Sequence, residues 1–599
     1  MMRVSDYIAN YIYDELKVKH VFMVTGAGIM HLTDGVALHG KLQTICPHHE
    51  QTSSMAMDAY SRITENIGVG FFTSGPGATN AITGLGGAWQ DSVPCLFISG
   101  QVKNKETTNN AKISGLRQFG VQELDLIPIV KPLCKYAITL DNPNKVRYEF
   151  EKASYIAKSG RPGPVWIQIP MDVQSAIIDE TELEGFSIEE KIPTVNDDEI
   201  NTLIQLLKKS SRPVIISGQG IRISGSIPLL EKFTSKFKIP VVTPFLGIDT
   251  MNHDLFQYVG KTGVKGDRAA NLAMQNSDLV ISIGSSLHVT VIGYTYEHFA
   301  RVAKKIVIDI DQTSHKKNTI KIDQFILSDA KKFFEKIIAS TENENLNDFS
   351  KWLIQCNDWK KKYPVCLPEY KKIKGTLSSY LLIDTLCIHS QENDIFVSDA
   401  GGTFYATSQA IKLTKKGQRY IPSGAMATMG YSLPASIGIS VATNKKRVIA
   451  LTGDGSFQQN IQELQTVVEY NLPIKLFVLN NDGYESIRTS QKNYFKNRFL
   501  GEGNQSGLSF PDIEKIAKAY GIKFIRISEY NGLDDKIDEV LNFNGPVLCE
   551  VMVSSNQKII PTVSSRVNAD GSMSSRPLED MYPFLDRDEY KKNLYVDEV

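Results

Sequence analysis

The sequence predicts an α/β fold of three domains, each with a mainly parallel sheet flanked by helices. Short apolar runs of strand length alternate with amphipathic segments, which is the pattern of βα units. Polar stretches divide these runs into three blocks. The chain has 599 residues, which leaves room for three large domains or four average ones at roughly 150 residues each.

We expect a first domain over residues 1–180, a central domain over 190–345, a third domain over 365–560 and a C-terminal tail over 561–599. An acidic, loop-like stretch separates the first two domains, and the tail is rich in Ser, Asp and Arg with little periodicity. The predicted strands are apolar runs bounded by glycine, proline or polar turn residues. They are Val21–Val24, Gly68–Thr73, Cys95–Ser99, Val165–Ile169, Pro213–Ser217, Leu279–Ile283, Ile306–Asp309, Ile395–Ser398, Val448–Leu451 and Ile474–Leu479.

Composition excludes several classes of protein. The 66 basic and 66 acidic residues balance to a net charge of zero, so a nucleic-acid partner is not expected. No run of about eighteen apolar residues predicts a membrane span, and the N-terminus lacks the apolar core of a signal peptide. The seven cysteines include no CxxC pair, which argues against a zinc site or a disulfide framework. We therefore expect a cytoplasmic protein.

The most informative motif lies in the third block. A predicted strand runs into Gly453-Asp454-Gly455-Ser456, a helix follows, and the next strand ends at Asn480-Asn481. Ligands of parallel sheets bind at these carboxyl ends. Asp454 can offer an anionic oxygen and Asn481 an amide oxygen, a set that suits Mg²⁺ shared with phosphate oxygens. Glycines beside a helix start let backbone amides approach an anion.

A Gly-Asp-Gly triplet alone is weak evidence for a cofactor site, because it also occurs in ordinary strand-to-helix turns. Its combination with Asn480-Asn481 at the end of the next strand is much more specific. The combination resembles the motif with which thiamine diphosphate enzymes bind the diphosphate and its metal. It therefore favours a cofactor site over a plain turn.

Glu50 in the first block follows His48-His49 and precedes a helix-like run. Taken alone, it is best explained as a surface or helix-capping acid. Beside the third-block motif, it resembles the glutamate that activates thiamine diphosphate by hydrogen-bonding a pyrimidine ring nitrogen. A carboxyl group among apolar and Gly-rich neighbours tends to have a raised pKa, which suits it to share a proton.

Over nearly its whole length the chain resembles the thiamine diphosphate-dependent decarboxylase and carboligase superfamily, most closely acetolactate synthase large subunits. The resemblance implies a pyrimidine-binding, a central and a diphosphate-binding domain. It also implies a homodimer or homotetramer, in which Glu50 of one chain faces Asp454 and Asn481 of another. A small regulatory subunit is compatible with this family.

The resemblance carries over to further positions. Gly483 would offer a backbone oxygen to the metal beside Asp454 and Asn481, and Gln122 is the polar residue expected to reach the reacting centre. Met429 would be the apolar wedge between the cofactor's rings, with core packing as the alternative. The cofactor-binding residues implied in this way are Gly26, Ser74, Gly401, Gly402, Thr403, Ala427, Met429, Gly453, Gly455 and Ser456.

Four departures from the synthase pattern bear on the second substrate and on FAD. Val121 stands where these synthases have Phe, and Ser490 where they have Trp. Gly284–His288 replaces an arginine-rich stretch that helps to hold FAD. The tail at Arg576–Met581, together with Gly483–Arg488, looks more like relatives that work in bacterial surface-sugar pathways.

The resemblance therefore implies an acetolactate synthase-like carboligase, an enzyme type of branched-chain amino acid biosynthesis. Such an enzyme decarboxylates pyruvate, a small 2-oxo acid, on thiamine diphosphate with Mg²⁺ and adds the two-carbon unit to an acceptor carbonyl. The alternative acceptor is a larger ketone such as a nucleotide-linked keto sugar. FAD stays open, because Gly218–Arg222 and Asp309–Asp311 suit either a dinucleotide or a plain turn. A non-catalytic subunit on the same fold is disfavoured by the joint presence of Glu50, Asp454 and Asn481.

Overall fold

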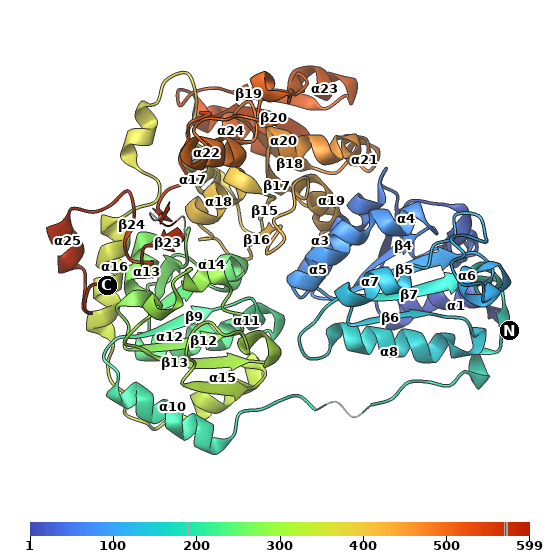
Figure 1. The fold of residues 1–599 in the computed structure, drawn as a ribbon, viewed down its shortest axis with the longest axis horizontal. Coiled ribbons are helices and arrows are strands. Elements are labelled where there is room, and N and C mark those ends of the chain that lie inside the picture. The colour runs from blue at the N-terminus through green and yellow to red at the C-terminus, as the bar shows by residue number, and fades with distance from the viewer. Residues whose placement is uncertain (189–190, 568–569, 571–572) are drawn as a thin grey trace.

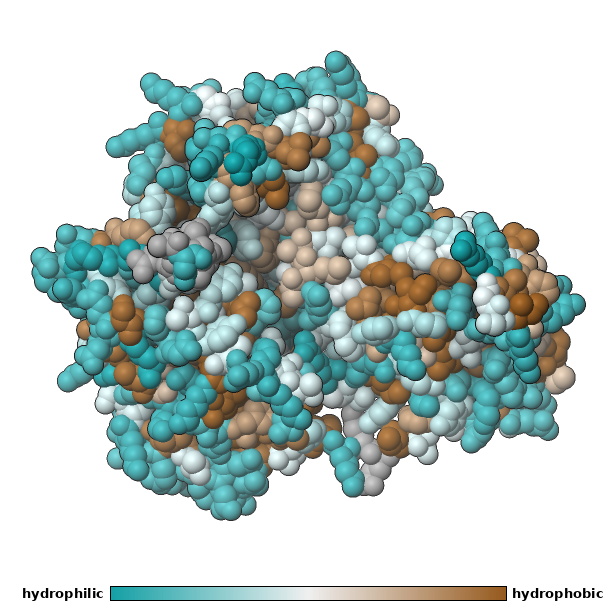
Figure 2. Space-filling model, in the orientation of Figure 1, coloured by the Kyte–Doolittle hydropathy of each residue, from teal (hydrophilic) through white to brown (hydrophobic). Residues whose placement is uncertain are grey.

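The computed structural model describes residues 1–188, 191–567, 570 and 573–599 (Figure 1). Three six-stranded sheets form its centre, and every neighbouring pair of strands within them is parallel. Helices flank each sheet, so the predicted fold class is confirmed. Figure 2 shows that the surface is hollowed where the three domains meet.

The first sheet is buried on both faces, as parallel sheets usually are. Every residue of its strands β4, β5 and β7 is buried, which explains why these segments are continuous apolar runs in the sequence. The strands in spatial order are β3 (Gln43–Ile45), β2 (His20–Met23), β4 (Gly68–Phe72), β5 (Cys95–Gln101), β7 (Val165–Pro170) and β6 (Tyr136–Thr139). The main helices are α1 (Val4–Asn10), α2 (Met30–His39), α3 (Glu50–Thr64), α5 (Ile82–Gln90) and α8 (Val146–Lys158).

The central sheet has the strand order 3-2-1-4-5-6 of doubly wound folds. Its strands are β11 (Tyr258–Lys261), β10 (Val241–Thr243), β9 (Pro213–Ser217), β12 (Leu279–Ile283), β13 (Lys304–Asp309) and β14 (Gln324–Leu327). Its main helices are α10 (Asp197–Lys209), α12 (Ile227–Phe237), α13 (Arg268–Gln275) and α15 (Ala330–Ser340). The C-terminal tail packs on this domain, where Gln275 on α13 donates a hydrogen bond to Glu579 at 2.7 Å.

The third sheet repeats the topology of the first. Its strands are β16 (Arg419–Pro422), β15 (Ile395–Ser398), β17 (Val448–Gly453), β18 (Ile474–Asn480), β20 (Val547–Met552) and β19 (Lys523–Ile527). Numbered by their place in each domain, both sheets have the order 2-1-3-4-6-5. The main helices are α17 (Ser379–His389), α18 (Gly401–Ala410), α19 (Ser432–Ala442), α20 (Asp454–Phe457), α21 (Leu464–Glu469), α22 (Glu485–Tyr494) and α24 (Leu533–Asn542).

Helix α3 of the first domain packs against helix α19 of the third. The backbones come so close that a Cβ on Gly438 would lie 2.0 Å from the carbonyl oxygen of Ala56. One hydrophobic core cluster consequently runs from the first domain into the third. Within the described ranges, no helix is long and apolar enough to cross a membrane.

A buried ionic network reinforces this contact. Arg62 on α3 pairs with Asp58 at 3.1 Å and with Asp91 at 2.8 Å. The hydroxyl of Tyr431 donates to Asp58 at 2.6 Å, and Asp91 accepts the backbone N–H of Ala425 at 2.8 Å. The network therefore fastens the first domain to the third-domain segment that precedes α19.

Candidate cofactor site

A cavity of about 290 Å³ opens at the carboxyl end of the third sheet, beside the ends of β17 and β18. Its lining includes every third-domain residue that the sequence assigns to the cofactor or metal. These are Gly401, Gly402, Thr403, Ala427, Met429, Gly453, Asp454, Gly455, Ser456, Asn481 and Gly483. Residues from four separate connections, those after β15, β16, β17 and β18, thus meet in one place.

Asp454 sits at the end of β17 and is buried. One carboxylate oxygen accepts the backbone N–H of Gly455 at 2.7 Å, and the other accepts the N–H groups of Asn481 and Gly483, both at 3.1 Å. Burial raises the pKa of Asp454 to about 6, while the backbone N–H groups act in the opposite direction. The carboxylate therefore links the two strand ends and is charged at neutral pH.

Asn481 tests whether the site suits a metal. Within the described part of the chain, its side-chain oxygen Oδ1 is buried and has no hydrogen-bond partner. An unpaired buried amide oxygen is costly unless a ligand satisfies it. Oxygen ligands are what Mg²⁺ requires, and one carboxylate with neutral oxygens is a usual protein contribution. The donor set of Asp454, Asn481 and the Gly483 carbonyl therefore fits Mg²⁺.

The N-terminus of helix α18 also lines the cavity through Gly401, Gly402 and Thr403. Its backbone N–H groups and helix dipole favour an anion. Gly401 has φ +61°, a left-handed conformation that glycine adopts without strain. The cavity therefore combines oxygen atoms suited to a cation with a helix N-terminus suited to an anion, the combination that a metal diphosphate requires.

The segment between β16 and α19 forms another wall. Met429 and Ala427 line the cavity, and Met429 is half-buried. The loop is held by the contact between Asp91 and Ala425 and by a hydrogen bond from the Thr428 N–H to the Ser423 hydroxyl at 2.6 Å. Met429 thus borders the cavity, and its role as a wedge stays a prediction.

Glu50 is the first residue of α3 and is 9% exposed. The preceding His49 caps the helix by accepting the Gln51 N–H at 3.0 Å. Glu50 Oε2 accepts a hydrogen bond from the side-chain amide of Asn80 at 3.0 Å. A Cβ on Gly77 would lie 3.1 Å from Glu50 Oε1, so the carboxylate sits against the loop after β4.

Gly26, Ser74 and Gln122 lie at the same edge of the first sheet as Glu50. A Cβ on Gly26 would meet the Thr73 hydroxyl at 2.5 Å. Ser74 is buried, whereas Gln122 is exposed and has φ +60°. These four predicted residues are not in the lining of the cavity, which is drawn entirely from residues 379–559. Within one chain, these first-domain residues and the cavity lining are therefore two distinct sets of predicted site residues.

Three residues beside the cavity received no role of their own from the sequence, although they lie in stretches that it singled out. Tyr484 and Glu485 line the cavity, and Glu485 accepts the Thr489 hydroxyl at 2.9 Å. Burial raises the pKa of Glu485. Burial also raises the pKa of Asp399 to about 7, although it accepts the Thr452 hydroxyl at 2.6 Å. Glu485 follows Gly483 by two positions, and this closeness to a predicted metal ligand could have marked it as a residue of the cavity.

Loop packing explains the glycines of the possible dinucleotide motif in the central domain. The Gly220 N–H donates to the Gly284 carbonyl at 3.0 Å, and a Cβ on Gly218 would lie 2.1 Å from the same oxygen. Asp311 accepts hydrogen bonds from Arg161 at 3.0 Å and from Ser314 at 2.6 Å. These glycines therefore give no separate argument for FAD.

Comparison with known proteins agrees with this layout. Residues 2–128 match the thiamine pyrophosphate enzyme N-terminal TPP binding domain, 200–337 its central domain and 399–551 its C-terminal TPP binding domain. The acetolactate synthase large subunit of Cyanidium caldarium is 31% identical over 564 residues, 92% of this chain and 93% of the relative. Those of Lactococcus lactis subsp. lactis (strain IL1403) and Porphyra purpurea are also 31% identical, over 93% and 91% of both chains respectively.

The order of the matched domains follows the order of the three sheets along the chain. The cavity lies in the domain that matches the C-terminal TPP binding domain, and Glu50 lies in the one that matches the N-terminal TPP binding domain. The chain therefore belongs to the thiamine pyrophosphate enzyme family and is related to acetolactate synthase large subunits.

Proposed function

We propose that the protein is an acetolactate synthase-like carboligase that uses pyruvate as the donor and requires Mg²⁺ and thiamine diphosphate. The observation that carries the proposal is the third-domain cavity, which combines oxygen ligands for a cation with a helix N-terminus for a diphosphate. The relatives over more than nine-tenths of the chain are acetolactate synthase large subunits.

The metal would be held by Asp454, Asn481 and the Gly483 carbonyl, and the diphosphate by amides of Gly401 and Gly402. Thiamine diphosphate, once bound, supplies the electron sink for loss of CO₂ from a 2-oxo acid. The chain would supply the position of the cofactor and the polar groups that surround it. Met429 would support the bent cofactor from the wall formed before α19.

Glu50 would share a proton with the pyrimidine ring nitrogen. Its Oε2 is engaged by Asn80, so Oε1 remains for the cofactor. Asn80 fixes the carboxylate in one orientation, as a group that exchanges protons needs. Gln122, exposed on the same domain, would reach the reacting centre from that side.

The complete site would form between two copies of the chain in a homodimer or homotetramer. The separation of Glu50 from the cavity lining supports this arrangement. Figure 2 also displays an apolar patch on the exposed face of the first domain. Exposed apolar residues of this domain include Trp89, Phe119, Val121 and Ile129. A second copy is the partner whose cavity would complete each half-site.

A second candidate keeps the donor and changes the acceptor to a larger ketone, such as a nucleotide-linked keto sugar. It is favoured by Ser490, which is exposed on α22, and by Val121, whose side chain is 82% exposed. Both are smaller than the aromatic residues of the synthase pattern. They would leave more room for an acceptor.

Incubation with pyruvate, Mg²⁺ and thiamine diphosphate separates the two acceptors. Formation of acetolactate supports the first proposal, whereas product only upon addition of a keto sugar supports the second. Ser490→Trp should reduce use of the larger acceptor and spare pyruvate, while the control Lys492→Trp on the same helix should change neither. Consumption of no 2-oxo acid under any condition would contradict both.

A further inference from the structure

The loop Asn481–Gly483 between β18 and α22 adopts an uncommon backbone conformation. Asp482 has φ +57°, and Gly483 has φ +142°. A non-glycine residue in the left-handed region is strained and persists only where its surroundings hold it. The same loop, called the metal loop below, carries the side-chain oxygen of Asn481 and the carbonyl oxygen of Gly483 that are assigned to Mg²⁺. Whatever holds this loop in place therefore also positions these two oxygens.

Arg488, on the first turns of α22, provides that restraint. Its guanidinium donates to the carbonyl oxygen of Asn481 at 3.2 Å and to that of Asp482 at 2.6 Å. Its Nε donates to Glu502 at 2.5 Å. One planar group thus joins two successive loop carbonyls to a carboxylate, which a lysine ammonium cannot do in the same geometry.

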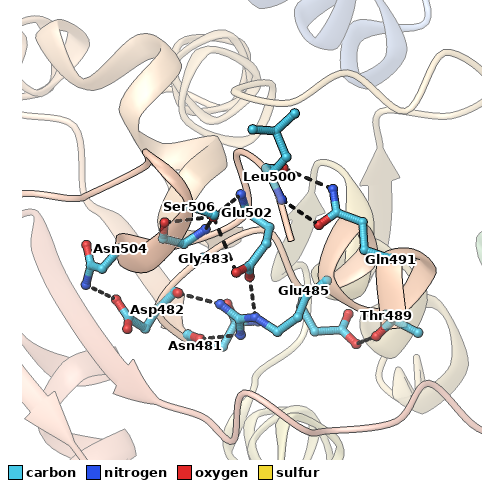
Figure 3. Close-up of polar contacts among 12 residues, drawn as sticks. Asn481, Asp482, Gly483, Glu485, Thr489, Gln491, Leu500, Glu502, Asn504 and Ser506 are labelled. Carbon is cyan, nitrogen blue, oxygen red and sulfur yellow. Dashed lines mark hydrogen bonds and ion pairs between the residues drawn. The ribbon is translucent and has the colours of Figure 1, made fainter. Parts of the chain in front are cut away.

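Glu502 is itself fixed. Its side chain is 10% exposed, its carbonyl accepts the Tyr484 N–H at 2.8 Å, and its own N–H donates to the Ser506 hydroxyl at 2.9 Å. A Cβ on Gly483 would lie 2.1 Å from the Glu502 carbonyl oxygen. The segment around Glu502 is therefore packed directly on the metal loop, as Figure 3 shows.

Two further contacts fasten this segment. The side-chain amide of Asn504 donates to Asp482 at 2.9 Å. The side chain of Gln491 both donates to and accepts from the backbone of Leu500, each at 3.0 Å (Figure 3). The segment after α22 is therefore held to α22 at Leu500 and to the metal loop at Asn504.

We propose that Arg488 and Glu502 are positioning residues for the metal site. They hold Asn481–Gly483 so that the Asn481 Oδ1 and the Gly483 carbonyl are oriented for Mg²⁺ before it arrives. We call this pair of residues the clamp. Because Glu502 neutralises Arg488, the clamp restrains the loop without adding net positive charge beside the cation. The inference rests on the Mg²⁺ and thiamine diphosphate site of the proposed function and concerns no substrate.

The test measures thiamine diphosphate binding to the purified full-length protein by calorimetry, at a series of Mg²⁺ concentrations and without substrate. Arg488→Met should raise the half-saturating Mg²⁺ concentration by roughly 10- to 100-fold, the usual effect of losing an outer-shell partner. Arg488→Lys, which keeps only part of the contacts, should fall between wild type and Met. Arg498→Met, a change at an exposed arginine of the same segment, should bind as wild type does.

Turnover separates this role from a general structural one. At saturating Mg²⁺ and cofactor, kcat of Arg488→Met should stay within about twofold of wild type, because the clamp touches no reacting atom. An unchanged Mg²⁺ requirement in Arg488→Met would overturn the proposal. If that variant does not fold, Glu502→Gln decides instead. Glu502→Gln should also raise the half-saturating Mg²⁺ concentration. A half-saturating concentration equal to that of wild type would refute the clamp.

The two proposals can fail separately. A wild-type protein that binds Mg²⁺ and thiamine diphosphate but makes no product from pyruvate would contradict the proposed function and leave the clamp standing. A normal reaction of the wild-type protein with pyruvate, together with an unchanged Mg²⁺ requirement in Arg488→Met and Glu502→Gln, would support the proposed function and contradict the clamp. Thiamine diphosphate binding that is independent of Mg²⁺ in wild type would also overturn the clamp.

Discussion

The ring of Tyr484 lies directly against Gly455, where a Cβ would approach the ring carbon Cε1 to 2.0 Å. Both residues line the cofactor cavity. Gly455 belongs to the motif at the end of β17, and Tyr484 follows the metal loop at the end of β18. The requirement for glycine at position 455 therefore comes from an aromatic side chain across the cavity and not from its own backbone angle.

Gly455→Ala should displace Tyr484 and weaken thiamine diphosphate binding, with a cost of about 1–3 kcal/mol as in other overpacked sites. Gly87→Ala on α5 is the control, since a Cβ there would meet nothing within 4 Å. Calorimetric titration with the cofactor measures both. Gly455→Ala combined with Tyr484→Ala should recover part of the loss, and a failure to recover would refute the steric explanation.

Removal of a metal ligand should be more severe. Asp454→Asn and Asn481→Ala should each weaken Mg²⁺-dependent cofactor binding by more than about 100-fold, beyond the range of an outer-shell loss. Asp482→Asn makes the same change as the first variant at a neighbouring position, where the new amide oxygen can still accept from Asn504, and should bind nearly normally. Thermal stabilisation by Mg²⁺ with thiamine diphosphate reports the difference. Equal binding by Asp454→Asn and Asp482→Asn would contradict the assigned ligands.

Glu50→Gln should leave cofactor binding nearly unchanged and slow exchange of the thiazolium C2 proton by about 100-fold or more. Proton NMR in D₂O with the bound cofactor measures that exchange. Glu65→Gln, at an exposed position just after the same helix, is the control. Exchange at the wild-type rate in Glu50→Gln would remove Glu50 from its proposed role.

The same variants test the shared site. Glu50→Gln and Asp454→Asn proteins are each expected to be inactive alone. After unfolding and refolding as an equal mixture, about a quarter of wild-type activity should return, because half of random dimers hold one intact site of two. No recovery despite hybrid dimer formation would place both residues in a site within one chain.

The buried carboxyl group of Asp399 predicts a pH dependence of stability. Its pKa is raised to about 7 by burial, against 3.8 for an ordinary Asp. Between these values the folded state holds a proton that the unfolded state has lost, so the free energy of unfolding falls as pH rises towards 7 and levels off above it. Asp399→Asn removes this dependence and retains an acceptor for the Thr452 hydroxyl.

The free energy of unfolding of Asp399→Asn relative to wild type should therefore increase from pH 5 to pH 7, by at most about 1.4 kcal/mol for each pH unit. Urea unfolding of the cofactor-free protein at several pH values measures it. Asp535→Asn, an exposed change on α24, should give a difference that does not vary with pH. A constant difference for Asp399→Asn would show that burial of the charge is not costly.

The sequence alone was sufficient to bring site residues together where these residues belong to one βαβ unit. Gly453–Ser456 and Asn481 lie on successive strands of a single βαβ unit, so their meeting at one sheet edge follows from spacing alone. Tyr484 against Gly455 and Asn80 beside Glu50 depend on the path of loops, which periodicity does not encode. The order of the strands also required the structure, because short edge strands such as β3 carry few apolar residues.

The shared strand order of the first and third sheets has an evolutionary consequence. Helices α3 and α19 each follow the second strand of their own domain, and they pack on each other. This is the arrangement that duplication and fusion of one ancestral gene would leave. Glu50 is then the first residue of one of the two equivalent helices, and Met429 stands just before the other. On that history, divergence of one repeated connection would have given one copy the proposed proton-sharing carboxylate and the other the proposed apolar support for the cofactor.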